Sequence, residues 1–333
     1  MRIFHYISIF VFMGIIVAFV YQYSPHYQII KGDIFGTYYN IKIRTDNKNN
    51  KLKDKIKERL QEINSSMSVF DPNSEISKIN NAPAKQRIEL SAAMRTVIKA
   101  ADKVYWQTKG YFDPSLGRLI ELWGFGSSSS VNPSAEDVKQ ALKASGFNKL
   151  KFANDFQYVT KTNSQTMLNL SAIAKGWATD EIAALLDQEG YDNYLVEIGG
   201  EVKTKGYREN QEPWTIGINR PLAGASDNIM VISLSNMAVA TSGNYRNFYS
   251  ADGKVLGHTI SYKTGEPVET NVASVSVFHS SCMMADAYAT AIVALGVEAG
   301  LELADRQKLK VIIFDNQYKQ HLSNAAEKMF QEK

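Results

Sequence analysis

Residues 238–296 read AVATSGNYRNFYSADGKVLGHTISYKTGEPVETNVASVSVFHSSCMMADAYATAIVALG, and this stretch carries the clearest signals of fold and chemistry. An apolar run ends in a Thr-Ser-Gly turn at 241–243, and His258 then opens a polar loop. The apolar run at 272–278 is typical of a buried strand, and a helical pattern follows it. Strands and helices that mix without strict alternation favour an α+β fold over a doubly wound sheet.

The helical pattern at the end of this stretch brings two oxygen-bearing side chains together. Ser280 or Ser281 can cap the N-terminus of the helix. Positions i and i+4 share a helix face, so Asp286 and Thr290 present a carboxylate and a hydroxyl side by side. Magnesium takes one or two carboxylates from a protein and leaves room for substrate phosphates. The same spacing also fits a solvated aspartate beside a threonine that bonds to its own helix.

A second stretch, NLSAIAKGWATD at residues 169–180, is expected to be a turn that leads into a helix. A short strand at 167–170 would deliver the chain to a helix over residues 171–186. A helix N-terminus that follows a strand offers free backbone N–H groups and a positive dipole end to a pyrophosphate. Lys175 adds positive charge there, and Gly176 allows the close approach of a ligand or of another backbone.

Together the two stretches resemble the FAD:protein FMN transferases, the ApbE family. The family has an Asp-Leu-Gly-Ala-Ile-Ala-Lys-Gly-like turn into a helix and an apolar-Ala-Thr-Ser-Gly turn. A His-Ile-x-Asp-Pro-x-Thr-Gly loop and an Ala-Asp-Ala-x-x-Thr helix follow. Matching elements occur in this order from about residue 32 to residue 296, together with the upstream segments Phe35-Gly-Thr and SVFDPNSEISKIN at 68–80. Several separate motifs in one order are a far more specific signal than any single motif.

The resemblance implies an ApbE-like, T-fold-like catalytic domain with mixed or antiparallel sheets and packed helices, built as one large unit of interlocked lobes. It also implies a magnesium site formed by the carbonyl of Ala172 with the side chains of Asp286 and Thr290. The residues that it places against FAD are Phe35, Trp123, Gly124, Phe125, Asn169, Lys175, Thr259 and Ile260. Without the resemblance, Phe35 and the aromatic residues near 123–125 would also suit a core edge.

The reaction implied by the resemblance is transfer of FMN from the substrate FAD to a Thr or Ser hydroxyl of another protein, with Mg²⁺ as cofactor and AMP as leaving group. A hydroxyl is a weak nucleophile and needs a nearby base. His258 fits that role because histidine titrates near neutral pH, and a structural loop histidine is the alternative. Asp286 is the second candidate base, although metal ligation would lower its basicity.

Three other functions compete with this interpretation. The same site with water as nucleophile would hydrolyse FAD to FMN and AMP. A periplasmic flavin-binding or electron-carrying protein would not need the Asp286 and Thr290 pair. A serine hydrolase built on Ser242 is disfavoured, since its turn lacks the glycine two residues before the serine that a nucleophile elbow has.

The chain departs from the family pattern at two places. Asn169 stands where the family usually has Asp, so an acceptor oxygen is kept and the charge is lost. Ser261-Tyr262 stands where the family has Asp-Pro, and the loss of the stiff proline is expected to loosen the loop.

Composition sets the remaining bounds. The 333 residues carry 37 Lys and Arg against 34 Asp and Glu, a net charge of +3 that gives no reason to expect nucleic-acid binding. Cys282 is the one cysteine, so no internal disulfide is possible, and its apolar neighbours indicate a small core residue rather than a nucleophile.

The N-terminal segment 1–25 is expected to lie outside the catalytic domain, which would span 26–333. Arg2 precedes an uninterrupted apolar run at 7–20, which is typical of a secretory signal or a short membrane anchor. No small-x-small cleavage site is evident, so an uncleaved anchor in the bacterial inner membrane is favoured. The positive charge predicts that the body lies in the periplasm. The resemblance implies acceptor subunits of membrane redox complexes as partners, such as the Na⁺-translocating NADH:quinone reductase.

Overall fold

The computed structural model describes residues 26–126, 133–153, 155–222, 227–243, 248–251 and 254–331. The predicted signal or anchor at 1–25 lies outside these ranges. Within them, none of the helices has the length and apolar character that a membrane span requires.

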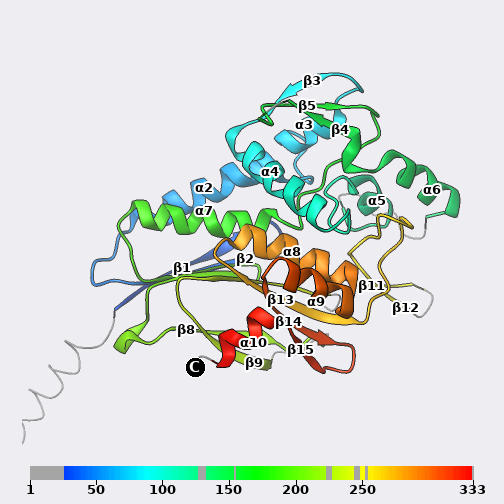
Figure 1. The fold of residues 1–333 in the computed structure, drawn as a ribbon. Helices are drawn as coiled ribbons and strands as arrows, with labels where there is room; N and C mark the ends of the chain where they lie inside the picture. Colours follow the sequence, from blue (N-terminus) through cyan, green and yellow to red (C-terminus); the bar gives the residue numbers. More distant parts are fainter. Residues whose placement is uncertain are drawn as a thin grey trace, which may run out of the picture.

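A sheet of eight strands forms the centre of the molecule (Figure 1). Its neighbouring strands pair antiparallel, and strands that are neighbours in the sheet are often distant in the sequence. In order across the sheet, the strands are β1 (Tyr27–Ile34), β2 (Thr37–Arg44), β6 (Tyr194–Ile198), β7 (Glu201–Lys205), β10 (Ala238–Gly243), β13 (Val272–His279), β14 (Lys310–Asp315) and β15 (Gln320–Leu322).

Helices cover one face of this sheet and form the main core with it (Figure 1). They are α2 (Lys51–Met67), α7 (Ala174–Gln188), α8 (Cys282–Leu295) and α9 (Val297–Arg306), and α4 (Ala92–Gln107) packs on α8 and α2 from the side away from the sheet. Helix α8 lies on β10 and β13 and contacts α7, α4 and α9. Its side chains are buried on nearly every side, as expected of a core helix, and its many alanines let the neighbours approach closely. A polar side chain on α8 is therefore held in a defined place.

The opposite face of the sheet packs on the hairpin of β8 (Trp214–Asn219) and β9 (Asn228–Leu234) and on α10 (Asn324–Gln331), around a second apolar cluster. A cavity of about 480 Å³ lies between β8 and residues of β1, β2, β6, β7 and β10. None of the predicted site residues lines this cavity.

The segment between β2 and β6 builds the upper part of the molecule in Figure 1. A small antiparallel sheet there has the order β3 (Arg87–Glu89), β5 (Tyr158–Lys161), β4 (Leu150–Phe152). The same segment contains α3 (Glu75–Asn81), α5 (Gly117–Leu122), α6 (Ala135–Ala144) and the 3₁₀ turn at Phe147–Lys149. Later in the chain come the 3₁₀ turn at Glu209–Gln211 and the strand pair β11 (Phe248–Ala251) and β12 (Lys254–Gly257). Helices α5 and α6 form a third apolar cluster with Ile260.

The predicted α+β class and the helix N-cap at Ser281 are confirmed, and Gly199-Gly200 joins β6 and β7 in an antiparallel hairpin. The strand expected at 167–170 is wrong: only an isolated bridge from Met167 to Leu116 forms. The next helix begins at Ala174 and not at residue 171, because the amides of Ile173 and Ala174 both bond to the carbonyl of Leu170 in a turn.

Candidate active site

Helices α7 and α8 touch at Gly176. A Cβ atom at this position would lie 2.4 Å from the carbonyl oxygen of Cys282 and 2.8 Å from Cβ of Asp286. The first of these is backbone and cannot turn aside, so only glycine permits the contact. The first turn of α7 is thereby pressed against the turn of α8 that carries Asp286.

The backbone amide of Gly176 donates to Oδ2 of Asp286 at 3.0 Å. Gly176 is the third residue of α7, and amides in the first turn have no partner within their own helix. The positive end of the α7 dipole also favours a carboxylate here. Asp286 is only 2% exposed. Burial raises the pKa of its carboxyl group, an effect that Lys175 and the Gly176 amide oppose.

Two further oxygen atoms belong to the same region. Thr290 lies one turn after Asp286, and its hydroxyl is 3.4 Å from the hydroxyl of Ser242 at the end of β10. The carbonyl of Ala172 accepts no hydrogen bond from any described residue. In a regular helix the amide of Gly176 would donate to that carbonyl, but here it donates to Asp286 instead.

These atoms fit the predicted magnesium site. A carboxylate, a hydroxyl and a free carbonyl are hard oxygen ligands, and Mg²⁺ completes such a set with water and substrate phosphates. Across the described ranges, no group of three His, Cys, Asp or Glu side chains could hold a metal, so a cage made only of those side chains is not offered there. A ligand set of this kind is compatible with Mg²⁺ that is shared with a phosphorylated substrate.

Lys175 lies between two buried carboxylates. Its ammonium is 2.6 Å from Oε1 of Glu201 and 3.9 Å from Oδ1 of Asp286. Burial works against the charged form, but the two carboxylates outweigh it and raise the pKa of Lys175, so the side chain is a cation. Glu201 is 3% exposed and its Oε2 has no hydrogen-bond partner among the described residues. Burial raises the pKa of Glu201, while Lys175 lowers it.

The turn between β1 and β2 comes to the same end of the sheet. Phe35 and Gly36 both have positive φ, +54° and +69°, as a type I′ hairpin turn requires. A phenylalanine is strained in this region, and such strain is found most often at ligand sites. A Cβ on Gly199 would lie 2.8 Å from Thr37 and 3.3 Å from the Lys175 side chain, so the two turns and Lys175 are neighbours.

The aromatic residues Trp123 and Phe125 follow the end of a short helix, α5. The amide of Gly124 bonds to the carbonyl of Glu121, and the amide of Phe125 bonds to that of Ile120. This is a Schellman motif, and the φ of +77° at Gly124 is the left-handed conformation that it needs. The motif turns Trp123 and Phe125 away from the helix axis.

The loop that begins at His258 packs on these aromatic residues. The Trp123 indole N–H donates to the carbonyl of Gly265 at 2.7 Å, and the rings of Phe125 and His258 have centroids 6.4 Å apart. Ile260 is buried in the third cluster, so its side chain is occupied by the core. Thr259 accepts a backbone bond from Val268.

Ser261 performs locally what the missing Asp-Pro was expected to do. Its hydroxyl accepts from the amides of Lys263 and Thr264 at 3.2 and 3.3 Å, and its carbonyl accepts from Gly265. The ring of Tyr262 packs edge-on against Tyr111. These contacts hold the loop at 258–265 in a closed turn without a proline. They oppose the loosening that the absence of Asp-Pro predicts.

The segment before α7 joins the two groups of residues. The amide of Asn169 donates to the carbonyl of Pro114, and that of Gly117 donates to Met167, which fixes the start of α5 beside the approach to Ala172. Oδ1 of Asn169 accepts from the amide of Ser171 at 2.9 Å. This turn needs only an acceptor oxygen, so Asn serves as well as Asp in shaping it.

The structure thus gives one group in which Lys175 contacts Asp286, Thr290 lies one turn further along α8 and Ala172 lies two residues before α7, with the turn at Phe35 near Lys175. It places Trp123, Gly124, Phe125, His258, Thr259 and Ile260 in a second group, and Asn169 between the two. Sequence reasoning missed Glu201 and Ser242 as neighbours of the site. A glutamate directly after a Gly-Gly turn, one residue from an apolar strand position, was the available signal for Glu201.

Replacing Gly176 with alanine is expected to lower the free energy of unfolding by about 1–3 kcal/mol, because the added methyl group must push α8 away. Thermal unfolding followed by circular dichroism measures this. Gly217 of β8 is the matched control, since its added Cβ would meet only the amide end of the exposed Asn228 side chain, at 2.4 Å, and that end can turn aside. Equal losses at the two positions would show that the backbone contact at Gly176 is not special.

Comparison with known proteins shows which family has this sequence and fold. The ApbE family model matches residues 35–313. A FAD:protein FMN transferase of Vibrio cholerae is 33% identical over 306 residues, covering 89% of this chain and 90% of the relative. The solved structure of flavin transferase ApbE from Vibrio cholerae superposes with a TM-score of 0.84 at 31% identity, covering 92% of this chain and 99% of that one. The ApbE protein of Thermotoga maritima gives a TM-score of 0.84 at 29% identity, covering 92% and 100%. With its order of motifs, its sheet and its paired helices, the chain belongs to the ApbE family.

Proposed function

We propose that this protein is a FAD:protein FMN transferase that uses Mg²⁺ to move FMN from FAD to a Thr or Ser hydroxyl of an acceptor flavoprotein. The observation that carries the proposal is the meeting of α7 and α8, where the Gly176 amide donates to Asp286 at 3.0 Å beside Lys175. The curated relatives with this activity match most of the chain, which supports the same reaction here.

The reaction replaces the phosphoanhydride bond between the two halves of FAD with a phosphoester bond to the acceptor. The acceptor hydroxyl oxygen forms a bond to the phosphorus of the FMN half of FAD, and the bond from that phosphorus to the bridging oxygen breaks. AMP leaves with the bridging oxygen, and the hydroxyl proton passes to a base. Positioning and electrostatic stabilisation account for most of the rate in such transfers.

Asp286, Thr290 and the Ala172 carbonyl would hold the cation. When bound, Mg²⁺ neutralises the charge that develops on the phosphate oxygens. Lys175, fixed by Glu201 at 2.6 Å and 31% exposed, supplies a further positive charge to the diphosphate. The amides of Ala174, Gly176 and Trp177 already have partners, so the positive dipole end of α7 adds to Lys175 in attracting an anion.

His258 is the base in this proposal. Its ring packs against Phe125, which orients the imidazole on the loop. Phe35, Trp123 and Phe125 offer aromatic faces for the flavin, and flat ring systems stack well on such side chains. In this proposal, the backbones of Gly124, Thr259 and Ile260 complete the flavin-binding surface beside these aromatic residues. Asn169 lies between that surface and the cation site.

The acceptors we propose are flavoprotein subunits of membrane redox complexes, including those of the Na⁺-translocating NADH:quinone reductase type. The location we propose is the periplasm, with residues 1–25 serving as a signal or as an anchor in the inner membrane. Arg2 followed by the apolar run at 7–20 supports that location.

Mass spectrometry of a candidate acceptor, after incubation with the protein, FAD and Mg²⁺, tests the function. We expect one FMN added at a single Thr or Ser, with no addition when EDTA is present or when that residue is alanine. Stoichiometric AMP without any modified acceptor would instead indicate FAD hydrolysis. Reversible flavin reduction with FAD left intact would indicate an electron carrier.

A further inference from the structure

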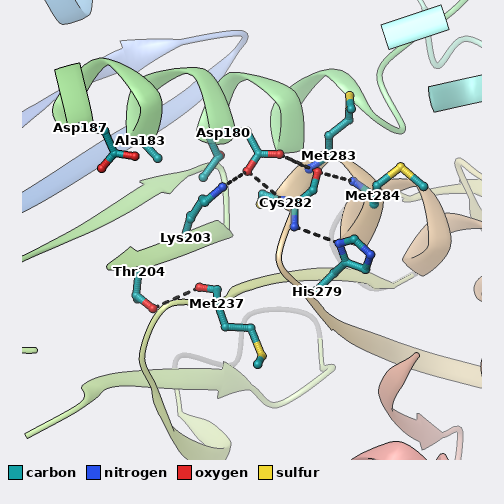
Figure 2. A network of polar contacts seen from close by, with 12 residues as sticks. Asp180, Ala183, Asp187, Lys203, Thr204, Met237, His279, Cys282, Met283 and Met284 are labelled. Carbon is teal, nitrogen blue, oxygen red and sulfur yellow. Dashed lines mark hydrogen bonds and ion pairs between the residues drawn. The ribbon is translucent and has the colours of Figure 1, made fainter. Parts of the chain in front are cut away.

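Asp180 of α7 caps the N-terminus of α8 (Figure 2). Its Oδ1 accepts from the amide of Cys282 at 3.0 Å, and its Oδ2 accepts from the amide of Met283 at 3.0 Å and from the hydroxyl of Ser281 at 2.7 Å. The first amides of a helix have no partner within the helix. A carboxylate from one helix therefore satisfies the start of the next, in addition to the cap that Ser281 itself gives to Met284.

A lysine from the sheet completes this network. Nζ of Lys203, on β7, lies 2.6 Å from Oδ1 of Asp180. The Asp180 side chain is 16% exposed, so the pair is largely shielded from water. Two residues earlier on the same strand, Glu201 holds Lys175. Asp180 thus ties together α7, α8 and the strand beneath them.

The contacts of Asp180 lie one helical turn from the contact between Gly176 and Asp286. Asp180 lies one turn after Gly176 on α7, and Asp286 lies one turn after Cys282 on α8. The contact at Gly176 sets how close the two helices come, since no Cβ fits there. It does not by itself prevent α8 from sliding along its own axis. The hydrogen bonds to Asp180 oppose that slide because they grip the end of α8.

We propose that Asp180 is a positioning residue for the cation site, acting through α8 to keep Asp286 and Thr290 opposite the Ala172 carbonyl. This inference rests on the proposed function, because it concerns the affinity of the same site for a divalent cation. Groups that hold metal ligands in place typically change metal affinity by about 10-fold to 100-fold when they are removed.

The test is a Mn²⁺ titration of the full chain in the presence of FAD and without acceptor, with free Mn²⁺ measured by electron paramagnetic resonance. Asp180→Ala is expected to weaken Mn²⁺ binding by about 10-fold to 100-fold. Activity should recover substantially at high Mg²⁺, since the ligands themselves remain. Asp180→Asn keeps one acceptor oxygen and should fall between the wild type and Asp180→Ala. Lys203→Met keeps the cap and should weaken Mn²⁺ binding less than Asp180→Ala.

Asp187 provides the matched control (Figure 2). It lies on the same helix two turns later, pairs with Lys205 of the same strand at 3.1 Å, and accepts from the Tyr194 hydroxyl at 2.9 Å. Asp187→Ala should lower stability with no change in Mn²⁺ affinity. If Asp180→Ala and Asp180→Asn bind Mn²⁺ as the wild type does, or no worse than Asp187→Ala, Asp180 does not position the site.

Asp286→Ala gives the background of Mn²⁺ held by FAD alone. If the wild-type protein binds Mn²⁺ no more tightly than this background, the proposed cation site does not exist, and the inference about Asp180 fails with it. If the wild-type protein binds Mn²⁺ tightly and the Asp180 variants bind it equally well, only the inference about Asp180 fails. The two failures are therefore distinguishable.

Discussion

Asp286→Asn is expected to lower the rate of flavin transfer by about 1,000-fold while leaving the fold intact. The amide oxygen of asparagine can still accept the hydrogen bond from the Gly176 amide, so the contact between α7 and α8 survives. The charge that binds the cation is lost, and charge stabilisation by a metal contributes several kcal/mol, with about 1.4 kcal/mol for each factor of ten.

The stability of this variant separates a functional residue from a structural one. Burial raises the pKa of Asp286, so the ionised form is disfavoured by its surroundings. Removing the charge should leave the thermal midpoint unchanged or higher, and Lys175 keeps Glu201 as its partner. Single-turnover transfer to a purified acceptor and thermal unfolding are the two measurements. A variant that transfers FMN at the wild-type rate would exclude Asp286 as a metal ligand.

His258→Asn is expected to reduce transfer by about 100-fold to 10,000-fold at saturating Mg²⁺, with little effect on FAD affinity, because general-base catalysis contributes that much. The wild-type rate should fall towards acidic pH as the imidazole takes up a proton, and the variant should lose this limb of the profile. Initial rates across a pH series, beside fluorescence titration with FAD, give both quantities.

His321→Asn is the control for His258. His321 pairs with Asp315 at 2.8 Å on β15, at the edge of the sheet, and has no place in the proposed reaction. Its replacement should leave the pH–rate profile unchanged. Should His258→Asn turn over as fast as the wild type, the proton must go to another group, and Asp286 becomes the base to test.

The local features of the site could be predicted from the sequence, because they depend on residues close together in the chain. The i, i+4 spacing of Asp286 and Thr290 and the cap at Ser281 follow from helix geometry alone. The hairpin at Gly199-Gly200 follows from turn chemistry. The order of motifs supplied the rest of the family assignment.

Contacts between distant segments could not be predicted in this way. The bond from Gly176 to Asp286 joins residues 110 positions apart, and the cap from Asp180 to Cys282 joins residues 102 apart. Neither follows from any local pattern. The helix at Gly117–Leu122 was also missed, since its glycine and aromatic residues are typical of a loop and its end is set by a Schellman motif. The turn at 261–264 was also not predicted, because this chain has Ser261 where the family has Asp. The Ser261 hydroxyl accepts the backbone hydrogen bond that a carboxylate could accept there.

The most direct test of this account is a crystal structure of the protein with FAD and Mn²⁺, in which anomalous scattering locates the cation. We predict a single strong peak within coordinating distance of the Asp286 carboxylate, the Thr290 hydroxyl and the Ala172 carbonyl, in contact with the diphosphate. A cation bound elsewhere, with FAD seated and Asp286 still held only by Gly176 and Lys175, would contradict it.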